Sequence, residues 1–345
     1  MHQELPLLDE RQSEILRAVI REHIATAEPV ASATLVRRYG LSVSSATVRS
    51  ELAGLEDVGL LTHPHTSAGR VPTDLGYRYF IEMLLPAPTL AAEEQVTVSH
   101  QFQQGLADTA EWLGLAASTL ARLTTEASIV TPPVSERATL RHVEAVPINE
   151  HRALVVVVTD GGAVRQQLIE LREPVTTDEL RAVSRRLAEL LAGQGAEGVA
   201  RSVAAERGVA ATVAATVART LQEEDDAGAT HVHLEGIGNI LAKPEFEETT
   251  RAREMLGILE DRTRLSAIFP QALRQGEVLV TIGSEHPLGP LRTCSVVFGR
   301  YGGREGVTGY VGVVGPTRMD YARTIGAVRF VGALMSDLVR VVEGD

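Results

Sequence analysis

The first 30 residues of the chain carry apolar side chains at helical spacing. These side chains recur every three or four positions between Ile15 and Ile24. Asp9 stands before them as a helix cap, with Gln12 three residues later as its capping-box partner. Pro29 ends the pattern, because a proline disfavours a helical conformation in the residue before it. The pattern predicts a first helix that buries one face.

Two further helices follow at short intervals. A short one is predicted from Ser32 to Tyr39, where Gly40 stops it. A serine-rich turn then opens a third helix, in which Ser44 or Ser45 acts as the cap. Its buried stripe consists of Val48, Leu52 and Leu55. Gly59 stands where a left-handed C-terminal cap belongs, so the third helix is expected to end there.

This order of helices is typical of a helix-turn-helix. The third helix would bury one face and leave small hydrogen-bonding residues and one arginine outward near its N-terminus, where unpaired N–H groups favour phosphate. Such side chains reach base edges and phosphates in DNA. A plain three-helix core with solvated serines is the less favoured interpretation. The candidate DNA-binding residues of this helix are Ser44, Ser45, Thr47, Arg49 and Ser50.

The segment after the third helix predicts a β-hairpin. "LLTH" reads as one strand and "GRVPT" as its partner, with "HPHTSA" at the tip. A hairpin in this place is the wing of a winged helix-turn-helix, and Gly69 would let its backbone approach DNA closely. Thr73 then caps a fourth helix. The candidate DNA-binding residues of the hairpin are His63, His65, Thr66, Ser67 and Arg70.

The rest of the chain alternates between helical and strand-forming stretches. Residues 89–126 predict one long helix after a proline-interrupted join. Residues 151–171 predict a hairpin that turns at Asp160-Gly161-Gly162. Residues 176–265 are mostly helical, with "HVHLEG" as a strand, and the strand-rich C-terminal part ends in a helix from about Tyr321 to Val342. This pattern alone predicts an α+β protein with two cores.

Composition and charge narrow the class of protein. The 345 residues carry a formal net charge of −12, but residues 29–50 hold Arg37, Arg38 and Arg49 and no acidic residue. Because the local field of a contacting face governs DNA binding, the net charge does not exclude it. No apolar run is long enough to span a membrane, and no secretion signal opens the chain. A cytoplasmic protein without a membrane partner is expected.

A few histidine, cysteine and acidic residues also suggest metal binding or catalysis. His63 and His65, or His231 and His233 with Glu235, could ligate a metal, but neither group has a full ligand set nearby. Cys294 could be a nucleophile, yet its alternating strand favours a buried structural thiol. No general acid–base pair stands out. We therefore expect no cofactor, no metal and no enzymatic activity.

Several motifs resemble one known family, the heat-inducible transcription repressors HrcA. The resemblance rests on "ERQSEIL", "EPVAS", "SSATVRSELAGLEDVGLL" and "PHTSAGRVPTDLGYRYF", and near the C-terminus on "IGSEH", "CSVVFGRY" and "GYVGVVGPTRMDY". It brackets nearly the whole chain, while residues 175–270 match only loosely. The hairpin motif is its most specific part.

The resemblance implies a domain layout. Residues 1–85 would form the winged-helix DNA-binding domain. Residues 89–175 and 271–345 would form a GAF-like α+β domain, interrupted by an inserted dimerisation domain at 176–270. The fold class is thus α+β multidomain.

The resemblance also implies a function. The protein would be a homodimer that binds an inverted-repeat operator in double-stranded DNA and represses heat-shock chaperone genes. A GroEL-type chaperonin would be its second partner and would keep it active. One alternative remains, a repressor with the same DNA-binding domain whose GAF-like domain senses a small metabolite. An enzyme that uses Cys294 or the histidines is a more distant third.

Overall fold

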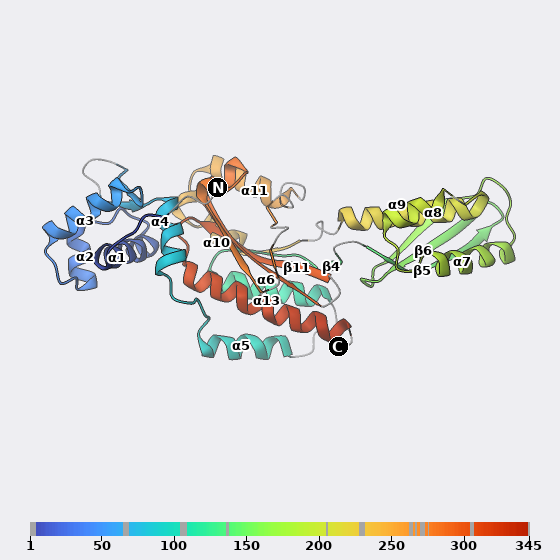
Figure 1. The fold of residues 1–345 in the computed structure, drawn as a ribbon, viewed down its shortest axis with the longest axis horizontal. Coiled ribbons are helices and arrows are strands. Elements are labelled where there is room, and N and C mark those ends of the chain that lie inside the picture. Colours follow the sequence, from blue (N-terminus) through green and yellow to red (C-terminus); the bar gives the residue numbers. More distant parts are fainter. Residues whose placement is uncertain are drawn as a thin grey trace. The chain divides into compact units, whose positions relative to one another are not determined.

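The computed structural model divides the chain into two compact units (Figure 1). It describes residues 5–64, 69–103, 109–135, 138–204, 206–227, 232–261, 265, 268–269, 273–274, 276–303 and 307–343. The first unit consists of 1–130, 233–301 and 310–335, and the second of 131–232, 302–309 and 336–345. Helices and strands mix in both, so the fold is α+β as expected. None of the described helices is long and apolar enough to cross a membrane.

The first unit opens with three helices and a small hairpin. These elements are α1 (Glu10–Thr26), α2 (Ser32–Tyr39), α3 (Ser45–Asp57), β1 (Leu61–Thr62) and β2 (Val71–Pro72). Asp9 and Gln12 form the predicted capping box of α1. The strands β1 and β2 pair antiparallel, with Leu61 opposite Pro72. The predicted order of three helices and a hairpin is confirmed.

A fourth helix leads from the hairpin toward the larger core of the first unit. The helix α4 (Asp74–Tyr79) begins at Thr73, as predicted, and continues as the π-helix η1 (Phe80–Leu84). After an irregular stretch the chain forms α5 (Ala92–Gln103) and α6 (Thr109–Thr124).

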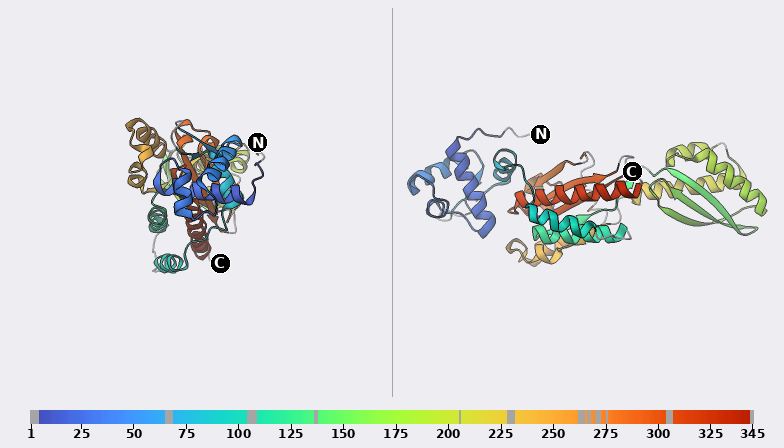
Figure 2. Two further views of the ribbon diagram at one scale, coloured as in Figure 1. Left: turned by 90° about the vertical axis from the view of Figure 1, so that its left-hand side faces the viewer. Right: turned by 90° about the horizontal axis from the view of Figure 1, so that it is seen from below.

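The prediction of one helix over 89–126 is wrong. Arg122 of α6 donates to Gln101 of α5 across 3.5 Å, so the two helices pack against each other, and Figures 1 and 2 draw them as separate helices. Apolar periodicity marks both helices equally well and does not show where a chain reverses between them.

The largest sheet contains six strands. Its order is β8-β3-β11-β10-β9, with β4 also paired to β11. The strands are β3 (Ala127–Val130), β4 (Val134–Ser135), β8 (His233–Glu235), β9 (Val278–Ile282), β10 (Cys294–Gly302) and β11 (Val307–Pro316). The strand-rich C-terminal part and the helix α13 (Tyr321–Glu343) are confirmed.

Two helices cover one face of this sheet. Ser128 of β3 donates to the Ala117 carbonyl of α6 across 2.7 Å. Val313 of β11 lies opposite Ser128, so Val311 of the same strand points to the same face. A β-carbon added to Gly332 of α13 would lie 3.3 Å from the Val311 side chain, so α13 passes close to this face. The helices α6 and α13 therefore bury the same face of the sheet, in agreement with Figure 1.

Short helices follow β8 in the sequence. They are α10 (Ile237–Leu241), η2 (Pro244–Phe246) and α11 (Thr249–Glu260), and between β9 and β10 lie η3 (Gly283–Glu285) and η4 (Gly289–Thr293). Lys243, the only lysine of the chain, lies between α10 and η2. Its Nζ donates to Oε1 of the buried Glu126 across 3.0 Å. Burial raises the pKa of Glu126 to about 7 despite this partner.

The second unit has a core of its own. Three antiparallel strands, β5 (Leu140–Asn149), β6 (Arg152–Thr159) and β7 (Val164–Glu170), form a sheet in that order. The predicted turn at Asp160-Gly161-Gly162 connects β6 to β7, and Gly162 takes a φ of +81° there. The helices of this unit are α7 (Thr177–Leu191), α8 (Ala196–Val203) and α9 (Gly208–Ala227).

The compact unit begins near residue 131 rather than at the predicted boundary of 176. Its hydrophobic core runs from Ala138 to Leu221 and combines the inner face of the sheet with the three helices. Val143, Val155 and Val157 are fully buried in it. The strands at 140–170 therefore share their core with helices that follow 176, because those helices cover their inner face.

Candidate nucleic-acid interface

A buried carboxylate joins the first two helices of the chain. Glu22 of α1 is 4% exposed and accepts hydrogen bonds from Arg38 (2.6 Å) and Tyr39 (3.1 Å) of α2. A buried charge is tolerated when it is paired and hydrogen-bonded in this way. Glu22 thereby fixes α2 on α1, and one of the arginines that the sequence placed in an acid-free segment is already engaged.

The third helix has well-defined ends. Ser44 caps it, and its side chain accepts a hydrogen bond from the Thr47 amide across 3.1 Å. At the other end the amide of Leu60 donates to the Leu55 carbonyl (3.0 Å), and Gly59 takes a φ of +78°. This is a Schellman motif, which glycine forms without strain. The predicted start and stop of α3 are confirmed.

The face of α3 opposite its buried stripe presents polar side chains. Ser44, Arg49 and Ser50 are exposed, and Thr47 is half-buried. None of the described residues forms an ion pair or hydrogen bond with the Arg49 side chain. Ser45 differs from the others, because its hydroxyl lies 2.9 Å from that of Ser32 in α2. The helix thus offers a free arginine and two exposed hydroxyls near its N-terminus.

The hairpin is held close to the start of α2. The backbones of Val30 and Arg70 exchange two hydrogen bonds, of 2.8 and 2.9 Å. A β-carbon on Gly69 would lie 2.4 Å from the Val30 carbonyl, closer than any real contact. The glycine is therefore required for the approach to Val30. The predicted tip residues His65, Thr66 and Ser67 lie outside the described residues.

The two remaining hairpin candidates share one partner on α3. Glu56 accepts from His63 through Oε1 and from the Arg70 guanidinium through Oε2, the latter across 2.6 Å. The hydrogen bond from His63 is the main cause that holds the pKa of Glu56 below its usual value, and Arg70 adds to it. The role of Glu56 could not be predicted from the sequence. Nothing in the pattern around Glu56 marks His63, seven residues later, or Arg70, fourteen residues later, as its partner.

The fourth helix contacts the larger sheet. Arg78 donates to the carboxylate of Glu285, through Nε across 2.9 Å, and to the Val280 carbonyl of β9 across 2.7 Å. The Ser284 amide donates to Asp74 across 2.8 Å. The direction in which α4 leaves the hairpin is therefore set by the edge of the sheet.

The candidate nucleophile and the candidate metal ligands can be compared with the structure where their residues are described. Cys294 is fully buried, and burial raises the pKa of its thiol to about 12, so the thiolate nucleophile is not formed near neutral pH. Within the described ranges no three histidine, cysteine or acidic residues are close enough to hold a metal ion. His233 and Glu235 lie on β8, and His231 lies outside those ranges.

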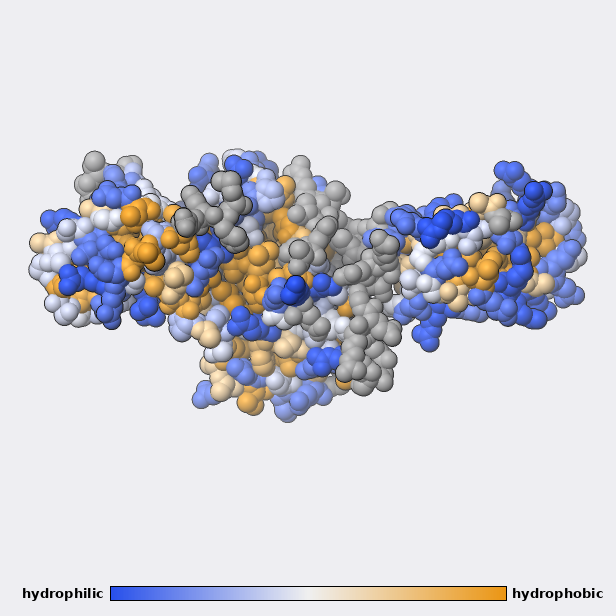
Figure 3. All heavy atoms as spheres, viewed as in Figure 1, coloured by the Kyte–Doolittle hydropathy of each residue, from blue (hydrophilic) through white to orange (hydrophobic). Residues whose placement is uncertain are grey.

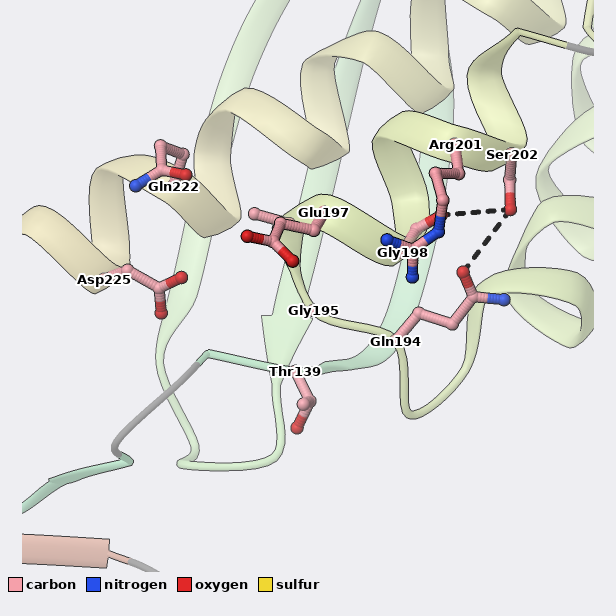
Figure 4. A pocket seen from close by; sticks show the side chains of 10 residues that line it. Thr139, Gln194, Gly195, Glu197, Gly198, Arg201, Ser202, Gln222 and Asp225 are labelled. Carbon is pink, nitrogen blue, oxygen red and sulfur yellow. Dashed lines mark hydrogen bonds between the residues drawn. The ribbon is translucent and has the colours of Figure 1, made fainter.

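A pocket of about 730 Å³ lies on the second unit (Figure 4). Its polar lining is largely satisfied within the protein, since Ser202 donates to Gln194 and to the Gly198 carbonyl, and Asp225 accepts from the Ala138 amide. This pocket does not identify a ligand.

Comparisons with known proteins identify the family of the chain. The family model of the HrcA protein C terminal domain matches residues 110–325. The chain is 42% identical to the heat-inducible transcription repressor HrcA of Roseiflexus castenholzii (strain DSM 13941 / HLO8), over 98% of this chain and 97% of the relative. The HrcA protein of Herpetosiphon aurantiacus is also 42% identical, over 100% and 98%. A crystallised protein described only as hypothetical shares the fold, with a TM-score of 0.60, 23% identity and coverage of 97% and 99%.

These relatives define the class of protein as repressors of transcription, which are regulators and not enzymes. The chain belongs to the HrcA family of heat-inducible transcription repressors. The resemblance noted in the sequence motifs is thereby confirmed.

Proposed function

We propose that the chain is a dimeric winged-helix repressor that binds an inverted-repeat operator ahead of heat-shock chaperone genes. The observation that carries the proposal is the exposed polar face of α3, where Arg49 has no partner among the described residues and the hairpin β1–β2 follows directly. A helix N-terminus with hydroxyls and an arginine suits base edges and phosphates.

The DNA-contacting residues fall into two groups in this proposal. Arg49, Ser44 and Ser50 are exposed on α3 and enter the major groove, with Thr47 and Ser45 beside them. The hairpin lies along the backbone of the DNA and contributes its tip. The hairpin candidates His63, His65, Thr66, Ser67 and Arg70 lie beside the DNA in this proposal, and Glu56 engages His63 and Arg70.

Dimerisation is proposed for the second unit. The outer face of its sheet carries an apolar row across all three strands, in which Val146, Leu154 and Leu168 lie opposite one another. Val146 is 42% exposed and Leu168 is 59% exposed. Figure 3 shows that apolar residues reach the surface of this unit. An exposed apolar face of this kind is typical of a protein–protein contact.

We assign the GAF-like domain to the six-stranded sheet with α6 and α13, and the inserted dimerisation domain to the unit around β5–β7. This assignment moves the proposed start of the insertion from 176 to about 131, because the strands at 140–170 share the core of α7–α9. The first domain keeps the proposed range 1–85.

Heat acts on the arrangement of the DNA-binding domains in this proposal. The contacts of Arg78 and Asp74 with residues 280–285 hold α4 on the larger sheet. Heating that loosens this sheet would release α4 and misplace the hairpin and α3 on an inverted repeat. A GroEL-type chaperonin would restore binding by refolding the sheet, without touching DNA.

Footprinting of the full chain on DNA upstream of chaperone genes tests the proposal. We expect protection of an inverted repeat, loss of protection after heat treatment, and recovery when chaperonin and ATP are added. Protection that returns only with a small molecule retained through purification would favour the metabolite sensor instead. Absence of any protected repeat would contradict the proposed function.

A further inference from the structure

The carboxylate of Glu56 joins α3 to the two residues that flank the hairpin loop. Glu56 lies in the last turn of α3, His63 directly follows β1, and Arg70 directly precedes β2. Both side chains donate to the one carboxylate, which is 22% exposed. The two side chains that flank the hairpin loop therefore attach the hairpin to α3, while the short β1–β2 pairing joins only its own two strands.

Arg70 is fixed in a second way. Its backbone pairs with Val30 before α2, and Gly69 beside it has no room for a side chain. The guanidinium of Arg70 is 24% exposed and reaches Glu56 from this anchored backbone. Two segments of the chain, the one before α2 and α3 itself, thus contact two neighbouring residues of the hairpin.

The Glu56 carboxylate changes how the side chains of His63 and Arg70 can interact with DNA. A carboxylate 2.6 Å from the Arg70 guanidinium cancels most of its attraction for a phosphate and would itself be repelled by one. Partly exposed ion pairs also contribute little to stability. The cluster is therefore better suited to fixing a position than to binding phosphate or stabilising the fold.

We propose that Glu56 is a positioning residue of the DNA interface. By holding His63 and Arg70 on α3, it sets the place of the strands β1 and β2 relative to the residues that enter the groove, and so favours the operator over other DNA. This inference rests on the proposed function and assigns His63 and Arg70 to Glu56 rather than to phosphates.

The central test is Glu56→Gln in the full chain, which removes the charge and keeps the size. On a scrambled duplex we expect a salt dependence steeper by about one counterion, because a cation is released toward the DNA. The ratio of operator to scrambled-duplex affinity should fall about tenfold as the hairpin loses its position. Hydrogen exchange of residues 60–72 without DNA should become faster.

Glu51→Gln is the matched control. Glu51 lies on the same helix and faces Arg11 of α1 at 3.8 Å, away from the hairpin. This variant should leave the affinity ratio and the exchange of residues 60–72 as in the wild type. Equal effects in the two variants would overturn the proposal, since a general change of charge on α3 would then explain them.

Arg70→Ala separates positioning from phosphate contact. If Glu56 holds Arg70, the variant lowers the affinity ratio and leaves the salt dependence unchanged, and adding Glu56→Gln lowers the ratio little further. A salt dependence flatter by about one counterion would show a direct phosphate contact and overturn the proposal. Should the wild type bind no operator, the proposed function fails, while the exchange of residues 60–72 still decides whether Glu56 holds the hairpin.

Discussion

Two exposed surfaces of the protein differ in the chemistry they offer. The face of α3 presents hydroxyls and Arg49, which has no partner among the described residues, close to a helix N-terminus. The outer face of the β5–β7 sheet presents aliphatic side chains, with Ile148 at 58%, Val164 at 52% and Leu168 at 59% exposure. The first surface suits a polyanion and the second suits another apolar protein surface.

The difference shows how one chain can separate recognition from assembly. Exposure of the polar groups on α3 costs little free energy, because water hydrogen-bonds to these groups until DNA takes the place of the water. The aliphatic face of the sheet is unfavourable in water and gains by being covered. In our proposal the two surfaces depend on each other only through the dimer, which brings two copies of α3 to one inverted repeat.

The largest effect is expected from Leu168→Asp on the apolar sheet face. A buried unpaired charge should weaken the dimer at least about 100-fold, in the range of interface hot spots. Because Leu168 is exposed in the single chain, folding should be unaffected. Sedimentation equilibrium measures the effect, and Leu190→Asp on α7, where Leu190 is 48% exposed, is the matched control. A dimer of unchanged strength in the Leu168 variant would remove this face from the interface.

A smaller effect is expected from Arg78→Ala in α4. The variant loses the hydrogen bonds to Glu285 and to the Val280 carbonyl, worth about 1–3 kcal/mol for bonds to a charged group. The melting temperature should fall and operator binding should be lost at a lower temperature than in the wild type.

Thermal circular dichroism and operator binding after stepwise heating measure this change. Arg251→Ala, which removes an exposed ion pair with Glu248 at 3.1 Å, should change neither quantity. If the two variants behave alike, the attachment of α4 to the sheet does not set the heat response.

The smallest effect is expected from Glu22→Gln in α1. It weakens the hydrogen bonds from Arg38 and Tyr39 and should lower the free energy of unfolding by about 1 kcal/mol, while base discrimination stays unchanged. Denaturant unfolding measures the loss, with the exposed Glu14→Gln on the same helix as control. Altered discrimination at any base pair would place Glu22 in recognition rather than in support.

Local signals made most of the structure of residues 1–85 predictable. Caps, glycine stops and apolar periodicity act within a few residues, so Asp9, Ser44, Gly59 and Thr73 marked their helix ends correctly. The buried thiol of Cys294 was also predictable from its alternating strand.

Contacts between distant residues were not predictable in this way. Glu22 stands in an amphipathic helix like any surface carboxylate, and only the fold brings Arg38 and Tyr39 to it. Ser45 was expected to face DNA, yet it is half-buried and its hydroxyl contacts Ser32. The compact unit that begins near residue 131 was not predictable for the same reason, since core sharing between strands and later helices leaves no mark at the junction.

The central claim is that α3 contacts the operator through Arg49, and Arg49→Ala tests it most directly. The account predicts one of two changes in operator titrations over a range of salt concentrations. Either the salt dependence becomes flatter by about one counterion, or discrimination at one base pair relaxes by about 1–3 kcal/mol. Arg185→Ala, on the exposed surface of α7, should change neither. Unchanged affinity, salt dependence and discrimination in a folded Arg49→Ala chain would contradict the claim.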